Sequence, residues 1–259
     1  MEYTNNYLAL ILTTALLLAP FALGDYDCAI KSPAEERDPL LRHRVRNALV
    51  ELIEALIINN KDNYYNSIIY NFKGSPDSPP NNIYIKGWCP YDVSKEVCAH
   101  WIAVIATQMS KACPTSTSAH MFHGSICYIR YDTKNFLGQP DTDAAHVGYG
   151  TARVMLFYFD YFTKKVDELM KMLTEMAPTQ RNMVGTGTTK ALLAKEISDV
   201  LRRKVNITGL AQCSTDLNKN TCLECLNQAK KELSNGCRGQ LACHVFLGSC
   251  ILKYEAVFF

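Results

Sequence analysis

The sequence predicts an α+β protein of two tandem disulfide-bonded domains, each with two helices packed on an antiparallel sheet. The first observation is a cysteine frame that returns 124 residues later, at Cys89, Cys98 and Cys113 and again at Cys213, Cys222 and Cys237. A spacing that recurs in three places indicates two copies of one unit. The second observation is that each copy combines stretches of helical periodicity with segments rich in β-branched and aromatic residues. Separate runs of this kind are typical of domains whose helices cover one face of an antiparallel sheet.

The first 24 residues contain the apolar run LALILTTALLLAPFAL, which ends in small residues just before Asp25. This length and ending predict a secretory signal peptide with cleavage near Gly24. The alternative is an uncleaved membrane anchor, but the run is short for a span of about 20 apolar residues. We therefore expect a secreted, extracellular protein. Its eleven cysteines favour disulfides, because thiols do not stay reduced in that compartment.

The first copy is expected to span residues 25–136. A helix is predicted from Asp38–Pro39, a suitable cap and first turn, to about residue 59. Two strands, 64–72 and 83–88, follow on either side of a loop rich in Gly, Ser and Pro. A second helix begins near Asp92 and contains Cys98, and residues 122–131 form a strand.

Residues 137–151 mix Pro, Gly and Asp without periodicity and are interpreted as a linker, so the second copy is expected to span 152–259. Its first helix is predicted at 162–176 and ends at Pro178. The segment 184–190 is interpreted as a flexible loop, and 190–204 suits either a helix or two strands. A strand at 205–211, a helix at 221–233 and a strand at 242–254 complete the copy.

Several classes of function find little support in the sequence. A net charge of +2 does not indicate a nucleic-acid partner. The residues Cys113, His120, His123 and Cys127 have the chemistry of a zinc site, but the two histidines would point to opposite faces of one strand. The histidines show no arrangement with a nucleophile, and we expect no catalytic residue, metal or cofactor.

The cysteine spacing in the second copy resembles a known plant domain. The pattern Cys213-x8-Cys222-x2-Cys225, followed by Cys237 and by Gly248-Ser249-Cys250, resembles the ginkbilobin-homologous, or stress-antifungal, domain. The first copy fits more loosely through Cys89-x8-Cys98 and Gly124-Ser125-Ile-Cys127. Two such domains behind a signal peptide resemble the plant cysteine-rich repeat secretory proteins. The resemblance implies two helices on a five-stranded antiparallel sheet and three disulfides in each domain.

The resemblance also implies which cysteines pair. The implied bridges are Cys28–Cys113, Cys89–Cys98, Cys213–Cys222 and Cys225–Cys250. Trp101 occupies the position of Cys225, which leaves Cys127 as a free thiol. That thiol is either an inert buried apolar group or a reactive, intermolecular one.

The second copy has Ala152 where the family has its first cysteine, so Cys237 loses its expected partner. Cys243 lies six residues further on, and we expect a local Cys237–Cys243 bridge. The sequon at Asn206 is a candidate glycosylation site, which would place that stretch at the surface.

The antifungal member of the family resembles a mannose lectin, and the resemblance implies which positions of this chain correspond to its sugar-binding residues. The candidates are His120 and Asp132 in the first copy and Arg153, His244 and Glu255 in the second. Carboxylates beside donors suit the vicinal hydroxyls of a sugar. The alternative is that Asp132 and Glu255 satisfy backbone groups or the neighbouring Arg130 and Lys253.

These observations favour a secreted, non-enzymatic protein of the plant apoplast that binds a carbohydrate, for which the resemblance suggests a mannose type, or a cell-surface partner, with a role in antifungal defence or symbiosis. The alternative is a protein-interaction module that docks on cell-surface receptor ectodomains without binding sugar. A third hypothesis is a thiol redox sensor that uses Cys127.

Overall fold

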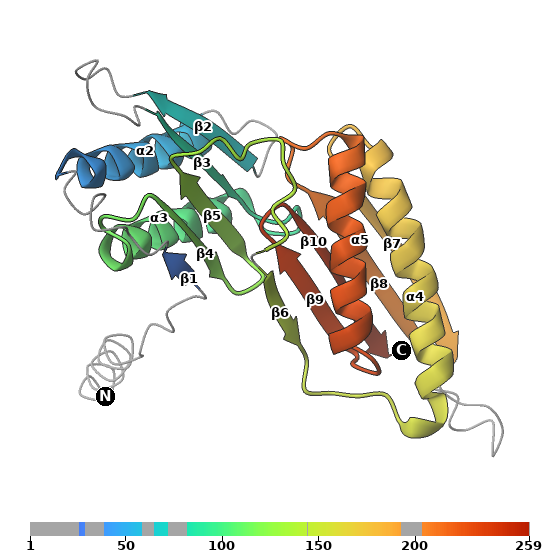
Figure 1. Ribbon diagram of the computed structural model, residues 1–259. Coiled ribbons are helices and arrows are strands. Elements are labelled where there is room, and N and C mark those ends of the chain that lie inside the picture. Colours follow the sequence, from blue (N-terminus) through green and yellow to red (C-terminus); the bar gives the residue numbers. More distant parts are fainter. Residues whose placement is uncertain are drawn as a thin grey trace, which may run out of the picture.

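The structure is a computed structural model that describes residues 26–28, 39–58, 65–71, 82–143, 145–192 and 204–258. The predicted signal peptide lies outside these ranges. The predicted α+β fold is confirmed: two antiparallel sheets of five strands lie next to each other, and each has two helices on one face (Figure 1). Within the described ranges, no helix has both the length and the apolar character needed to cross a bilayer.

The first domain contains β1 (Tyr26–Cys28), α2 (Pro39–Ile58), β2 (Tyr65–Asn71), β3 (Asn82–Trp88), α3 (Lys95–Ala112), β4 (Ser118–His123) and β5 (Cys127–Asp132). Its strands have the order β1-β4-β5-β3-β2. The Ser94 side chain caps α3 by accepting a hydrogen bond from the Val97 amide at 3.3 Å, so this helix begins slightly later than expected. The apolar face of α3, including Ile102, Ile105 and Met109, is fully buried against the sheet.

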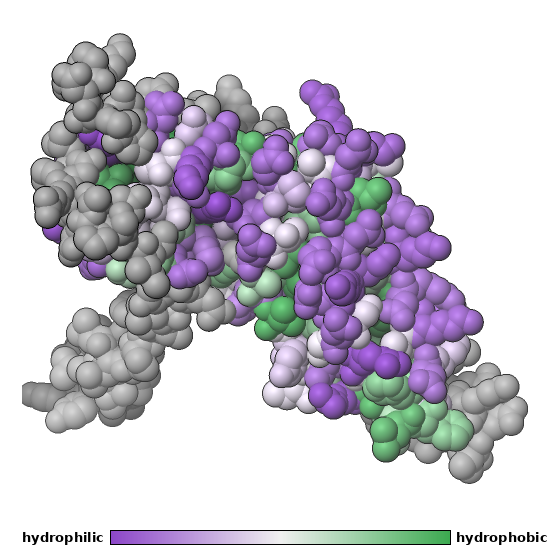
Figure 2. Space-filling view, in the orientation of Figure 1, coloured by the Kyte–Doolittle hydropathy of each residue, from purple (hydrophilic) through white to green (hydrophobic). Residues whose placement is uncertain are grey.

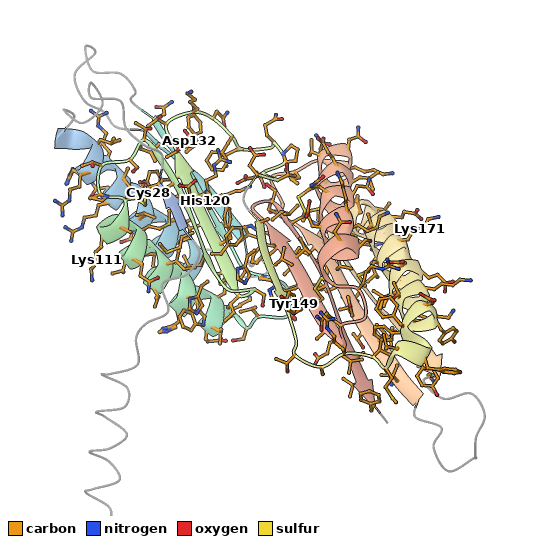
Figure 3. All side chains as sticks on the ribbon, turned by 60° about the horizontal axis from the view of Figure 1, so that its bottom comes forward. Cys28, Lys111, His120, Asp132, Tyr149 and Lys171 are labelled. Carbon is orange, nitrogen blue, oxygen red and sulfur yellow. A yellow bond between two sulfur atoms is a disulfide. The ribbon has the colours of Figure 1, made fainter. Side chains whose placement is uncertain are left out.

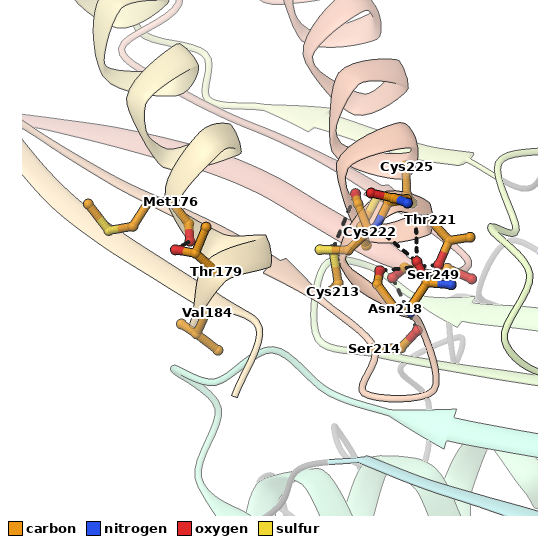
Figure 4. The surroundings of a disulfide bond; sticks show 12 residues. Met176, Thr179, Val184, Cys213, Ser214, Asn218, Thr221, Cys222, Cys225 and Ser249 are labelled. Atoms are coloured by element: carbon orange, nitrogen blue, oxygen red, sulfur yellow. Dashed lines mark hydrogen bonds between the residues drawn. A yellow bond between two sulfur atoms is a disulfide. The ribbon is translucent and has the colours of Figure 1, made fainter. Parts of the chain in front are cut away.

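The second domain contains β6 (Ala145–Tyr149), the short 3-10 helix η2 (Leu156–Tyr158), α4 (Phe159–Met176), η3 (Ala177–Thr179), β7 (Val184–Leu192), β8 (Lys204–Cys213), α5 (Lys219–Gly236), β9 (Ala242–Leu247) and β10 (Cys250–Phe258). Its strands have the order β6-β9-β10-β8-β7, the same layout as in the first domain. The Asn218 side chain caps α5 and forms a reciprocal capping box with Thr221 (Figure 4).

Three expectations for the elements are corrected. The strands expected at 122–131 and 242–254 are hairpins, β4–β5 and β9–β10, each broken by a Gly-Ser turn. The expected linker contains β6, which pairs with β9 and extends the second sheet. The expected loop at 184–190 belongs to β7, where a Cβ at Gly185 would lie 3.1 Å from the Leu173 carbonyl oxygen of α4 and a Cβ at Gly187 would lie 3.0 Å from Met172 Cε. Glycine at these positions allows the helix to pack close to the sheet, but in the sequence the same glycines look like those of a loop.

The disulfides agree with the implied pairing in most places. The structure contains Cys28–Cys113, Cys213–Cys222, Cys225–Cys250 and the local bridge Cys237–Cys243. Each bridge stabilises the fold by about 2 to 4 kcal/mol when it constrains the unfolded chain. The implied Cys89–Cys98 bridge is present as well, but its Cys89 sulfur has a second contact.

The expectation that Cys127 stands apart as a free thiol is corrected. Cys89 lies in disulfide contact with both Cys98 and Cys127, and all three sulfurs lie within 4.8 Å of one another. Among the described residues, every cysteine sulfur is in contact with at least one other cysteine sulfur. Sequence reasoning missed this contact because it considered one partner position for Cys127, the one that corresponds to Cys225, and that position holds Trp101.

The two domains meet through the sheet faces that their helices leave open. Trp88, Phe122 and Tyr128 of the first sheet pack with Leu210, Phe246 and Ile251 of the second. The Trp88 and Phe246 rings meet edge to face with their centroids 4.7 Å apart. This shared apolar cluster makes the two domains one packed body.

Hydrogen bonds between the domains surround this cluster. The Trp88 indole N–H donates to the Gly248 carbonyl at 3.1 Å, and the Lys86 ammonium donates to Ser249 Oγ at 2.6 Å. Burial lowers the pKa of Lys86, while Asp216, 3.9 Å away, and Asp141 favour its charged form. A fully buried lysine is costly unless it has such partners, so this contact specifies how the domains are oriented.

The interface predicts a large difference between two phenylalanine substitutions. Phe246→Ala removes a fully buried ring from the shared cluster and is expected to lower the free energy of unfolding by about 3 to 5 kcal/mol. The matched control, Phe157→Ala, removes a ring that is 81% exposed and is expected to change stability by no more than about 0.5 kcal/mol. Guanidinium unfolding followed by tryptophan fluorescence measures both. Equal effects of the two substitutions would contradict the interface described.

Candidate functional site

A groove of about 530 Å³ lies on the open face of the second sheet, beside the interface with the first domain. Residues that line the groove from this face include Gly148 of β6, Thr186 of β7, Thr208 and Leu210 of β8, Ala242 and His244 of β9, and Lys253 and Glu255 of β10. The first domain contributes Asp92, from the turn between β3 and α3. The groove is therefore built from both domains.

Strand register places the polar residues of the groove side by side. Lys253 on β10 pairs with His244 on β9 and with Leu210 on β8. Glu255, two residues further along β10, pairs with Thr208. Because side chains alternate between the faces of a strand, the ammonium, imidazole, carboxylate and hydroxyl groups all lie on the open face.

Gly148 makes room for the His244 ring. The two residues are register partners, and a Cβ at position 148 would lie 2.4 Å from His244 Cε1. Any larger residue would push the imidazole out of its place. The ring also stacks on His146, with centroids 5.4 Å apart.

The His244 imidazole is held in its neutral form. Burial, helped by the nearby His146 and Lys253, lowers its pKa from 6.5 to about 4. Its buried Nε2 has no hydrogen-bond partner among the described residues. A neutral imidazole presents one donor and one acceptor, so a ligand hydroxyl could satisfy this nitrogen.

Lys253 joins the groove to the first domain. Its ammonium forms an ion pair with Asp92, which is half-exposed, and this pair crosses the domain boundary. Glu255 is exposed. On β8 and β7, the strands that follow β10 in the sheet, Thr208 Oγ1 lies 3.3 Å from Thr188 Oγ1. The groove therefore offers an acceptor carboxylate, a shared cation and hydroxyl groups within a few residues.

The structure brings His244 and Glu255 together but leaves out Arg153, the third candidate of the second copy. Arg153 forms an isolated bridge with Gln240 and does not line the groove. With the Gln240 amide oriented to satisfy its neighbours, its oxygen accepts from Arg153 Nε at 3.1 Å. Arg153 is thus engaged in closing the edge of the domain.

The first-copy candidates His120 and Asp132 lie on β4 and β5 of the other sheet (Figure 3). They occupy the places that correspond to His244 and Glu255, because His120 pairs with Arg130 as His244 pairs with Lys253. The Asp132 carboxylate accepts from Arg130 at 3.1 Å and from the Lys134 amide at 2.9 Å. This carboxylate is satisfied within the domain, as the structural alternative supposed.

The corresponding face of the first sheet is covered. Phe136 lies over the Arg130 guanidinium, 4.3 Å from ring centroid to Cζ, and Asp141 forms an ion pair with Arg130 at 3.0 Å. Tyr128 donates to the same Asp141 carboxylate at 2.6 Å. Burial lowers the pKa of the neighbouring His120. The segment between the domains therefore fills the first copy's face and leaves the second copy's groove open.

The predicted glycosylation site, Asn206, is not among the residues that line the groove. Asn206 lies in β8, half-buried, with its amide oxygen covered and without a partner among the described residues. Asp92 and Gly148 were missed by sequence reasoning. Asp92 was assigned to a helix start and Gly148 to a linker, and only the register of β6 and the domain contact reveal their place.

Comparisons with known proteins give one family. A family model described as salt stress response/antifungal, Stress-antifung, matches residues 37–134 and 158–257, one match on each sheet. Cysteine-rich repeat secretory protein 55 of Arabidopsis thaliana is 27% identical over 188 residues, which are 71% of this chain and 67% of that protein. An antimicrobial ginkbilobin-2-like protein of Castanea crenata is 28% identical over 167 residues, 64% of each chain.

A solved structure has the same fold. The tandem DUF26 ectodomain of a cysteine-rich receptor-like protein from Arabidopsis thaliana matches with a TM-score of 0.64 and 22% identity. The match covers 90% of this chain and 97% of the ectodomain, so it includes both domains.

The depressed pKa of His244 predicts a pH dependence of stability. Because the folded state favours the neutral ring, the contribution of His244 to the free energy of unfolding is fully present above pH 6.5 and is lost as the pH falls toward about 4. We expect the free energy of unfolding to fall over this window, and to fall less in His244→Gln than in the control His43→Gln, which removes an exposed imidazole. Urea unfolding at several pH values measures the difference. An NMR titration of His244 with a midpoint above 6 would contradict the prediction.

Proposed function

The chain belongs to the Stress-antifung family, and from that premise we propose that it is a secreted, non-enzymatic binding protein of the plant apoplast whose second domain binds a neutral carbohydrate. The observation that carries the proposal is the open groove with His244, Lys253 and Glu255 on adjacent strands. Names of relatives support the secretory and antimicrobial setting. The ligand itself is argued from the groove.

The polar groups suit vicinal hydroxyls. A sugar needs acceptors and donors side by side, and the Glu255 carboxylate supplies acceptors while Lys253 supplies a donor. His244 Nε2 is a buried polar atom without a partner among the described residues, and a ligand hydroxyl would remove that cost. A groove of about 530 Å³ matches the volume of typical small-ligand sites.

The charges of the groove favour a neutral ligand. The Lys253 cation already has the Asp92 carboxylate beside it, and Glu255 adds a further negative charge. The low pKa of His244 keeps its ring uncharged at mildly acidic pH. An anionic sugar would meet two carboxylates and one shared cation, so a neutral hexose of mannose type fits better.

A second candidate function is docking on a cell-surface receptor ectodomain. The observation in its favour is an apolar tip at η2, where Met155, Leu156 and Phe157 are 72%, 92% and 81% exposed. Figure 2 shows apolar atoms gathered at the lower end of the second domain, while the outer face of α4 and α5 is largely hydrophilic. Contiguous exposed apolar residues of this kind mark interaction surfaces.

A glycan array with the secreted protein tests the carbohydrate proposal. We expect selective binding of neutral mannose-type glycans, reduced at least about tenfold in the double variant His244→Ala/Glu255→Ala, because a lost hydrogen bond to a charged group costs about 1.5 to 3 kcal/mol. The matched control is His120→Ala/Asp132→Ala, which changes the corresponding positions of the covered first sheet. It is expected to bind as the unaltered protein does.

Each outcome separates the two candidates. If both double variants lose binding equally, the loss reflects impaired folding, and the result gives no support for binding in the groove. No binding to any glycan would reject the carbohydrate proposal. Docking on receptor ectodomains would then be measured with Leu156→Ala/Phe157→Ala, which is expected to weaken it without lowering stability.

A further inference from the structure

Eleven cysteines cannot all pair within one chain, and the odd one belongs to a specific cluster. Eight form four separate bridges, which leaves Cys89, Cys98 and Cys127. All three are fully buried, and their sulfurs lie within 4.8 Å of one another. A sulfur forms one disulfide at a time, so Cys89 has two alternative partners and one thiol always remains.

The second domain shows how this cluster arises. In the second domain, Cys213 on β8 is the register partner of Cys250 on β10. In the first domain, Trp88 on β3 is the register partner of Tyr128 on β5, so the next residue along the chain, Cys89, lies beside Cys127. In the second domain, however, Cys225 of α5 holds the Cys250 sulfur in its own bridge. Trp101 replaces that cysteine in the first domain. The Cys127 sulfur is consequently left facing the Cys89–Cys98 bridge.

We propose that Cys89, Cys98 and Cys127 form an internal thiol–disulfide exchange site that controls the loop carrying Asp92 into the groove. In the exchange, the Cys127 sulfur attacks the Cys89 sulfur as its thiol loses a proton. The Cys89–Cys98 bond breaks, and the Cys98 sulfur leaves as a thiolate and takes up a proton. One disulfide forms and one breaks, so no oxidant or reductant is needed.

Local geometry makes Cys89–Cys98 the resting bridge. Its Cα atoms are 5.8 Å apart, close to the 5.7 Å of the equivalent Cys213–Cys222 bridge. The Cα atoms of Cys89 and Cys127 are 4.2 Å apart, just below the usual range of about 4.4 to 6.8 Å. Burial opposes thiolate formation, whereas fixed proximity favours attack, and uncatalysed exchange of this kind takes minutes to hours.

The two bridges hold different elements. Cys89–Cys98 ties the end of β3 to the first turn of α3 and closes the loop that contains Asp92. Cys89–Cys127 ties β3 to β5 instead and releases that closure. The loop is attached to the second domain by the Tyr91 amide, which donates to Gln212 Oε1 at 2.6 Å, and by the Asp92–Lys253 ion pair. Exchange therefore loosens the wall that the first domain contributes to the groove.

Disulfide mapping tests the exchange without any ligand. The secreted protein is unfolded in acid with N-ethylmaleimide, digested without reduction and analysed by mass spectrometry. We expect one label per chain, divided between Cys127 and Cys98 in proportions independent of protein concentration, and none on Cys89. A label found only on Cys127, or a sulfur tied to a second chain, overturns the proposal.

Three variants sharpen the mapping. Cys127→Ser and Cys98→Ser are each expected to reduce the label from one per chain to none, because each leaves one partner for Cys89. Trp101→Cys recreates the arrangement of the second domain and is also expected to give no label, with all molecules holding Cys89–Cys98. Two labels per chain in Cys98→Ser would show that Cys89 and Cys127 do not bond, and would overturn the proposal even if Trp101→Cys failed to fold.

Hydrogen exchange tests the effect on the loop. Amides of residues 91–97 are expected to exchange at least about tenfold faster in Cys98→Ser than in Cys127→Ser, because only Cys127→Ser retains the loop closure. Equal rates would overturn the control of the loop. A consequence for sugar affinity rests on the proposed function, whereas the labels and exchange rates do not, so failure of the two proposals is distinguishable.

Discussion

The structure depends on the contact between β3 of the first domain and the Gly248–Ser249 turn of the second. Lys86 brings a buried ammonium to Ser249 Oγ, and the Trp88 indole donates to the Gly248 carbonyl. Only glycine fits at 248, because a Cβ there would lie 2.3 Å from Asp141 Oδ2. A buried cation with few alternative partners tolerates little displacement, so this contact holds the two sheets in one relative position. The apolar cluster around it supplies the driving force, and the polar contacts supply the orientation.

This fixed orientation explains why two copies of one unit have different faces. The segment that leaves the first domain crosses its own sheet, where Asp141 and Phe136 cover Arg130. The same segment then becomes β6 at the edge of the second sheet and leaves that face open. The turn after β3 places Asp92 against Lys253. The groove is thus a product of the domain contact, and the second sheet alone would lack one of its walls.

Much of the fold was predictable from the sequence because the cysteine repeat and helical periodicity are local signals. The expectations that failed, for the hairpins β4–β5 and β9–β10 and for the strands β6 and β7, lie where a glycine or a tertiary contact decides the outcome. Gly124, with a φ of 51°, makes a hairpin from an apparently continuous strand, and Gly187 fits β7 beneath α4. The candidate site was predictable only in part. His244 and Glu255 lie where the resemblance put them, whereas Asp92 reaches the groove through a domain contact that no spacing in the sequence encodes.

The rigid domain contact is tested most directly by hydrogen exchange of the two tryptophan indole protons, followed by NMR. The chain has only Trp88, whose indole N–H crosses the interface, and Trp101, which is half-buried on α3 and serves as an internal reference. We predict that the Trp88 proton exchanges only through global unfolding, with the same dependence on denaturant as the slowest amides of the core. Exchange of that proton by a local opening, independent of denaturant, would instead show that the two domains separate while each stays folded, so that the contact between them is not rigid.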